Sequence, residues 1–188
     1  ELRVKDVLPL HGSVEVNGRN SPDTTRTRLV GSISYDNLWQ KFHSLSLMYQ
    51  VSPENTNQVK VLAGTYVLPI RDSTDRLALY AIRSESESTV ATADSTGIIG
   101  KGTLAGARWI MPLDSSQDYY HSMILGADYK DLKENITLTG TNGLETPISY
   151  SSFSTEYQAT HLAGDSLTGF SAGFHFGVRG LGNSEKEF

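Results

Sequence analysis

The chain has 188 residues, of which 38% are hydrophobic and 20% are charged, with a net charge of −5 and a mean hydropathy of −0.30. The negative net charge argues against a nucleic-acid partner held by phosphate contacts, and the absence of cysteine excludes disulfides and thiolate metal sites. No apolar run approaches the ~18–20 residues of a membrane-spanning helix, which excludes a helical membrane protein. A transmembrane β-barrel stays possible because only every second strand residue meets lipid.

In chain order, the sequence reads as nine strands. Segments rich in Val, Ile, Thr, Tyr and Phe alternate with links that contain Gly, Ser, Pro and Asp. No window holds a hydrophobic period of 3.6 residues, so helices are not expected. The predicted strands are 10–19, 26–35, 43–51, 58–68, 76–84, 101–111, 119–130, 148–161 and 166–178.

Four of these strands, 26–35, 43–51, 119–130 and 166–178, alternate apolar and polar residues. Successive side chains on a strand point to opposite sides, so each of the four has one apolar and one polar face. Alternation alone fits two folds equally well. One is a β-sandwich with a wet outer face, and the other is a barrel with a watery lumen.

The links between the strands favour the barrel. Segments 36–42, 69–75, 112–118 and 162–165 read as compact turns, whereas segments 85–100, 131–147 and the chain after Gly177 read as long polar loops. Outer-membrane barrels keep short turns at the periplasmic end and long loops outside. Aromatic residues near strand ends fit the girdles at the membrane interfaces. They are Tyr35, Trp39, Phe42, Tyr66, Trp109, Tyr119, Tyr120 and Tyr150.

The strand count and an internal echo predict a repeating hairpin unit within a longer barrel. Segments 66–75 and 109–118 share an aromatic residue, two apolar residues, a proline, an apolar residue and a polar turn. Nine strands is an odd number, whereas bacterial single-chain barrels have an even number, and an open sheet leaves two unpaired edges in lipid. We therefore expect residues 9–188 to form the N-terminal portion of a barrel, and residues 1–8 to end a preceding domain.

Several segments, in this order and spacing, resemble a known family. They are 8–17, 21–25 together with Arg28, 35–38, 43–47, 52–53, Tyr66 with Pro69, 106–108, 111–113, and 121–130. The chain resembles the outer-membrane translocators of two-partner secretion, the hemolysin secretion/activation proteins of the POTRA-bearing barrel superfamily. The resemblance implies the end of a periplasmic POTRA domain at residues 1–8, followed by the first nine or so strands of a sixteen-strand, antiparallel, up-and-down transmembrane barrel.

The resemblance also implies a function. The full protein would lie in the bacterial outer membrane, in contact with its lipid, and would export a large secreted partner protein of the adhesin or hemolysin type without nucleotide energy. The family's Val-Arg-Gly-Tyr motif does not occur, and Val178-Arg-Gly-Leu181 is a partial match at a different place. An outer-membrane barrel assembly factor and a secreted β-sandwich adhesin or binding domain are the alternatives.

No motif points to an enzyme or a cofactor. The five histidines show no metal-ligand spacing, no Gly-x-Ser-x-Gly elbow occurs, and Gly100-Lys-Gly102 lacks the rest of a phosphate-binding fingerprint. A charge that faces lipid at mid-depth costs ~2–4 kcal/mol, so charged strand residues are expected to face the lumen. Arg28 and Arg108 would contact a transiting chain or an inner plug, or would each form a structural ion pair with a carboxylate across the lumen. The candidate lumen-facing residues are Arg28, Arg108, Asp128 and Glu156.

Overall fold

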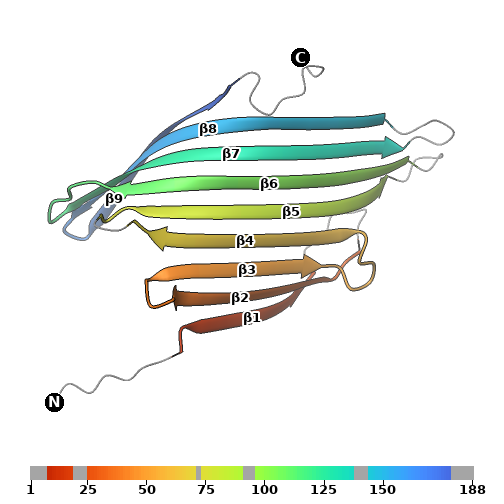
Figure 1. The fold of residues 1–188 in the computed structure, drawn as a ribbon, viewed down its shortest axis with the longest axis horizontal. Coiled ribbons are helices and arrows are strands. Elements are labelled where there is room, and N and C mark those ends of the chain that lie inside the picture. Colours follow the sequence, from red (N-terminus) through yellow and green to blue (C-terminus); the bar gives the residue numbers. More distant parts are fainter. Residues whose placement is uncertain (1–7, 19–24, 71–72, 91–95, 138–143, 179–188) are drawn as a thin grey trace.

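The fold is a single antiparallel sheet whose strands follow one another in chain order. A computed structural model describes residues 8–18, 25–70, 73–90, 96–137 and 144–178, without the side chains of 86–90, 96–100, 134–137 and 144–147. The strands are β1 (Leu10–Asn17), β2 (Arg28–Leu38), β3 (His43–Val51), β4 (Val59–Pro69), β5 (Arg76–Val90), β6 (Thr96–Pro112), β7 (Tyr119–Thr137), β8 (Leu144–Ala163) and β9 (Ser166–Gly177). Each pairs with the next, in the order β1 to β9 (Figure 1). Among the described residues, no helix is long and apolar enough to span a membrane.

All nine predicted strands are confirmed, and the compact turns lie together at one end of the sheet (Figure 1). The echo between the two proline-containing segments marks equivalent places, because Pro69 ends β4 and Pro112 ends β6. The β8–β9 turn is the tightest. It reverses at Gly164, whose φ of 56° lies in the left-handed region that glycine adopts without steric cost.

The predicted long loops at 85–100 and 131–147 are wrong in extent. The β5–β6 ladder continues from the Glu85–Lys101 pair to the Val90–Thr96 pair, and the β7–β8 ladder continues to the Ile136–Leu144 pair. The sequence of these extensions shows no regular alternation of apolar and polar residues, which is the pattern that marks a strand. Backbone hydrogen bonds to the neighbouring strand hold them instead.

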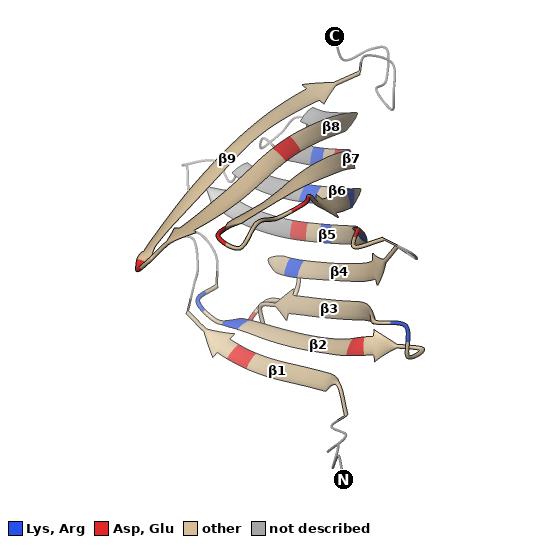
Figure 2. Cartoon of the chain, turned by 90° about the vertical axis from the view of Figure 1, so that its left-hand side faces the viewer, with Lys and Arg blue, Asp and Glu red and all other residues tan. Residues whose placement is uncertain are grey.

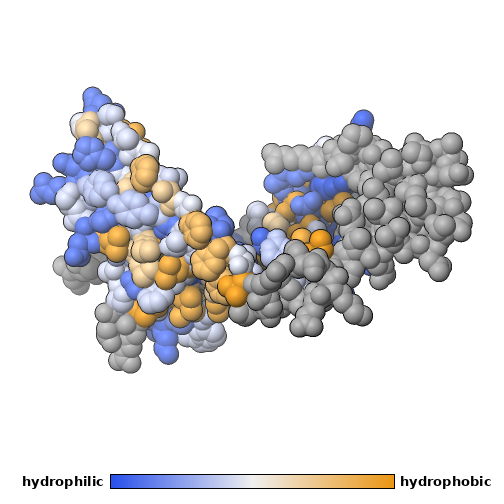
Figure 3. Space-filling model, turned by 90° about the horizontal axis from the view of Figure 1, so that it is seen from above, coloured by the Kyte–Doolittle hydropathy of each residue, from blue (hydrophilic) through white to orange (hydrophobic). Residues whose placement is uncertain are grey.

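The sheet curves. Seen from the turn end, the strands follow an arc (Figure 2). The strands also lengthen along the chain, from 8 residues in β1 to 20 in β8. Seen from above, the molecule is hollowed on one side, and hydrophobic side chains gather near the middle of the view (Figure 3).

The register gives the sheet two chemically distinct faces. One row across β5 to β8 contains Leu79, Ala107, Ala127 and Phe153. The next row contains Tyr80, Gly106, Asp128 and Ser152. Side chains of neighbouring rows point to opposite sides. We call the side that carries Leu79 the apolar face and the side that carries Tyr80 the polar face.

Within the described residues, no protein layer covers the apolar face. Phe170, Phe174 and Leu125 are 60%, 63% and 37% exposed. Ala159 is the single hydrophobic residue that is buried in the described part of the chain. A β-sandwich would bury this face between two sheets, whereas all nine described strands belong to one sheet. The sandwich alternative is therefore excluded for this part of the chain.

The predicted domain boundary near the start of the chain stays a prediction. We expect residues 1–8 to end a preceding domain, and all of them except Leu8 lie outside the described residues. The backbone amide of Asp36 donates to the Pro9 carbonyl at 2.9 Å, so the chain joins the sheet directly before β1.

Candidate functional surfaces

An ion pair on the polar face joins β6 to β7. The guanidinium of Arg108 binds the carboxylate of Asp128 with two parallel hydrogen bonds, of 2.6 Å from Nη1 and 2.8 Å from Nη2. The Tyr80 hydroxyl donates to the same carboxylate, and the guanidinium lies 5.2 Å from the centre of the Tyr80 ring. The Asp128 side chain is 11% exposed and that of Arg108 is 27% exposed. This bidentate geometry fixes both side chains more firmly than a single contact would.

Two glycines make room for this cluster. A Cβ atom added at Gly106 would lie 2.3 Å from Asp128 Oδ1 and 2.7 Å from Tyr80 Cζ. One added at Gly126 would lie 2.2 Å from Ser154 Oγ and 2.9 Å from Arg108 Cζ. Glycine within a strand marks a close approach of this kind. The polar face is thus packed around the ion pair.

The structure brings together two of the four candidate residues. Arg108 and Asp128 form the ion pair, and the carboxylate lies on the neighbouring strand instead of across a lumen. Arg28 begins β2, and Glu156 lies on β8, where its Oε1 accepts a hydrogen bond of 2.9 Å from Gln158. Sequence reasoning missed Tyr80. Its strand has apolar residues on both faces, so the sequence carried no signal that set Tyr80 apart.

Arg28 anchors the connection that precedes β2. Arg28 is only 4% exposed, and its Nη1 donates to the carbonyl oxygens of Thr25 and Thr27 at 2.6 and 3.0 Å. The Thr25 hydroxyl shares a hydrogen bond with Ser52, which is fully buried. The segments before β2 and after β3 are therefore held together.

Glu54 completes this junction from the β3–β4 connection. Its Oε1 accepts a hydrogen bond of 2.6 Å from the Thr27 hydroxyl, and its Oε2 accepts one of 3.1 Å from the Arg26 amide. The hydrogen bond from Thr27 is the main cause that lowers the pKa of Glu54 below its usual value of 4.5. The ionised carboxylate is the form that accepts from both donors.

Glu54 makes the junction sensitive to acid. A carboxyl group whose pKa is lowered by folding stabilises the folded state above its unfolded pKa, and this contribution is lost as the pH falls through the folded pKa. We expect Glu54→Gln to unfold at lower urea concentration than the wild type at neutral pH, and the difference to vanish near pH ~2. Urea titrations at both pH values measure it. A difference that stays constant with pH would contradict this role.

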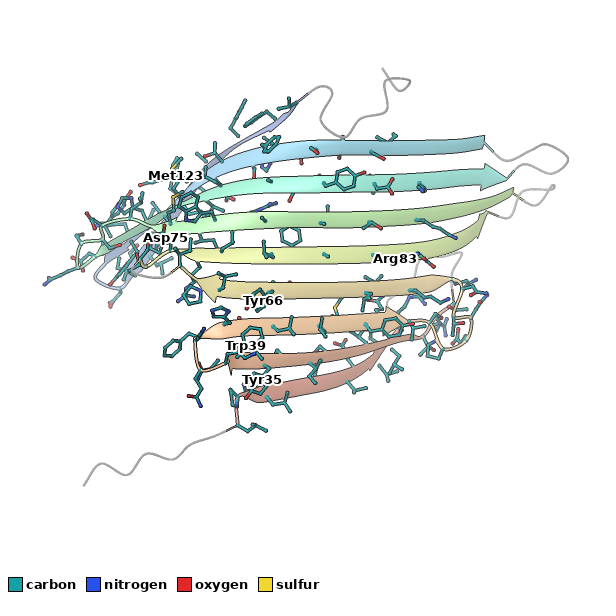
Figure 4. The ribbon with its side chains drawn as sticks, viewed as in Figure 1. Tyr35, Trp39, Tyr66, Asp75, Arg83 and Met123 are labelled. Atoms are coloured by element: carbon teal, nitrogen blue, oxygen red, sulfur yellow. The ribbon has the colours of Figure 1, made fainter. Side chains whose placement is uncertain are left out.

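Aromatic and histidine side chains form a belt at the turn end of the apolar face. Trp39, His43 and Tyr66 meet edge to face, with ring centres 5.6 to 6.3 Å apart (Figure 4), and His43 Nδ1 shares a hydrogen bond with the Tyr66 hydroxyl. Trp39 is 69% exposed and holds a positive φ of 55°, which costs a non-glycine residue of order 1 kcal/mol. The tight turn between β2 and β3 thus holds the indole ring of Trp39 in an exposed position.

A second group continues the belt on β7 and β8. The Tyr119 and Tyr157 hydroxyls lie 2.7 Å apart, and His121 Nδ1 lies 3.1 Å from the Tyr157 hydroxyl. Between the two groups, the indole of Trp109 donates to Asp75 at 2.9 Å. Rings with a polar tip, placed beside an apolar band, are typical of a membrane interface. Tyr150, which we expected in a girdle, lies instead against Lys130 at 5.3 Å.

Comparison with known proteins identifies the fold. No protein-family model matches the chain, and no curated protein matches its sequence. The structure superposes on CdiB from Escherichia coli, a two-partner secretion translocator of the outer membrane, with a TM-score of 0.84 and 15% sequence identity. The match covers 98% of this chain and 34% of that one. The nine strands therefore have the fold of part of the CdiB barrel, and the resemblance noted in sequence is confirmed at the level of the fold.

Proposed function

We propose that this chain forms part of an outer-membrane barrel that exports a partner protein across the bacterial outer membrane. The observation that carries the proposal is a single curved sheet with an uncovered apolar face, in an arrangement that matches part of CdiB. Lipid hydrocarbon can cover such a face, because a closed barrel satisfies all of its backbone polar groups within the sheet. The fold itself supports several functions, so export rests on the similarity to CdiB.

In this proposal, the polar face lines the lumen. Arg28, Arg108, Asp128 and Glu156 then lie on the lumen side of the wall, which avoids the cost of placing a charge in hydrocarbon. The aromatic belt lies at the periplasmic interface, and the ends of the long hairpins lie outside the cell. The Arg108–Asp128 pair stiffens the wall between β6 and β7. An exported chain would therefore pass side chains that are held in place there.

Deletion of the gene for the full protein tests the function. We expect a secreted partner protein to disappear from the culture medium, and re-expression of the wild type to restore it. Immunoblots of medium, periplasm and outer membrane measure the distribution of the partner. Unchanged export after deletion would contradict the proposal.

The same experiment separates export from barrel assembly. If the protein were an assembly factor, its deletion would leave the same proteins in the medium but would lower the amounts of other barrels in the outer membrane. We expect porin levels to stay equal in the deletion strain and the wild type. A loss of porins together with unchanged secretion would favour the assembly factor.

A further inference from the structure

The apolar face changes character towards the loop end of β5, β6 and β7. On β5, Leu79 and Ala81 are followed on the same face by Arg83, which Figure 4 shows near the far end of the strand. The side chains of the three strands enclose a groove of about 240 Å³ there. Its charged and hydroxyl-bearing lining residues include Arg83, Glu85, Lys101, Thr103, Asp131 and Lys133.

Two lysines of this groove face each other across the β6–β7 ladder. Lys101 and Lys133 are directly opposite in the β6–β7 ladder, and like charges in this position repel. Neither forms a salt bridge within the described residues. An anion between the two ammonium groups would convert this repulsion into attraction.

The carboxylates of the groove are already engaged. Glu85 lies opposite Lys101 in the ladder, but its Oε1 binds Arg83 at 2.8 Å. The Oδ1 of Asp131 accepts a hydrogen bond of 3.0 Å from the Ser149 hydroxyl. Three cationic side chains therefore line the groove against two anionic ones, in a chain whose net charge is −5.

The depth of the groove fits a lipid headgroup. On β7, the apolar stretch lies between His121 in the aromatic belt and Asp131 in the groove, which are ten positions apart. At ~3.3 Å per residue and a strand tilt of ~40°, this spacing corresponds to about 25 Å of height, the thickness of the apolar band of a barrel. In the proposed orientation, the groove lies at the headgroups of the outer leaflet.

We propose that this groove binds a phosphate group of lipid A, the phosphorylated lipid of the outer leaflet. The ammonium groups of Lys101 and Lys133 hold the phosphate between them, and the Thr103 hydroxyl donates a hydrogen bond to it. The lipid chains then lie along the apolar face below. The inference rests on the membrane orientation given under the proposed function, and it adds a specific lipid site.

Binding of purified lipid A to the full protein in detergent tests the site. Native mass spectrometry gives the fraction of protein with lipid bound, for lipid A with its phosphates and for dephosphorylated lipid A. We expect the wild type to retain only the phosphorylated form, and the double substitution K101Q/K133Q to weaken its retention at least about tenfold, since two charge-assisted contacts are lost. K130Q is the matched control. It removes a lysine at nearly the same height on β7 but from the polar face, and it should bind as the wild type does.

Three outcomes would overturn the site. They are equal binding by the wild type and the double variant, equal binding of dephosphorylated lipid A, and full displacement by inorganic phosphate, which would mark a site for a free anion. Fractionation of cells that express the wild type or the double variant measures separately whether each protein is in the outer membrane. A double variant that remains in the outer membrane and still binds lipid A defeats the lipid site alone, whereas a wild type absent from the outer membrane defeats the proposed function.

Discussion

Gly106→Val is expected to lower the free energy of unfolding by about 3 kcal/mol, the upper range for an overpacked site. The new Cβ would lie within 2.7 Å of the Tyr80 ring, which cannot move aside without leaving Asp128. The substitution would therefore separate the tyrosine from the ion pair as well as crowd it. Urea unfolding of the full protein in lipid vesicles, followed by tryptophan fluorescence, measures the change.

Gly31→Val provides the matched control. Gly31 also lies within a strand, but a Cβ at this position would meet nothing within 4 Å. Valine favours extended backbone, so we expect this variant to be as stable as the wild type or slightly more stable. Equal destabilisation by both valines would show that the crowding around the ion pair has no energetic weight.

Asp128→Ala is expected to cost about 2 kcal/mol, because it leaves the partly buried Arg108 guanidinium without its carboxylate. A double-mutant cycle with Arg108→Ala measures the interaction between the two side chains. We expect a coupling energy of about 1–3 kcal/mol between the two residues, as for contacting groups in one network. Unfolding titrations of the two single variants and the double variant give this value.

The Arg83–Glu85 pair offers the comparison. Its contact of 2.8 Å is nearly as short as the 2.6 Å contact of Arg108 with Asp128, but its side chains are 70% and 29% exposed, against 27% and 11%. Exposed pairs contribute little, so we expect a coupling energy below about 1 kcal/mol there. A larger coupling for Arg83 and Glu85 would contradict the view that partial burial and the fork geometry strengthen the inner pair.

The strands could be predicted from the sequence because they are rich in β-branched and aromatic residues, and because four of them alternate apolar and polar residues. The alternation in 43–51 and 119–130 set their faces, and the prolines and aspartates set the turns. The ends of β5 and β6 beyond Glu85 and Lys101 show no such regular alternation, so that signal is missing there. The prediction therefore ended these strands too early.

The polar-face cluster was predicted only in part. Arg108 and Asp128 could each be assigned to a charged face, but their pairing depends on the register between β6 and β7, which places Gly126 opposite Arg108. A register is fixed by the whole ladder and not by one strand. The roles of Tyr80 and Gly106 follow from the same register, so strand-by-strand reasoning could not reach them.

The most direct test of this account is the accessibility of successive positions on β3, since the apolar face is expected to meet lipid. The chain has no cysteine, so single substitutions such as Leu45→Cys, Ser46→Cys, Leu47→Cys and Met48→Cys can carry a nitroxide label in the full protein reconstituted into vesicles. We predict that labels at 45 and 47 collide with oxygen dissolved in the lipid, whereas labels at 46 and 48 collide with a water-soluble nickel complex. Labels at 45 and 47 that are shielded from both reagents, or that meet nickel as readily as their neighbours do, would contradict the account.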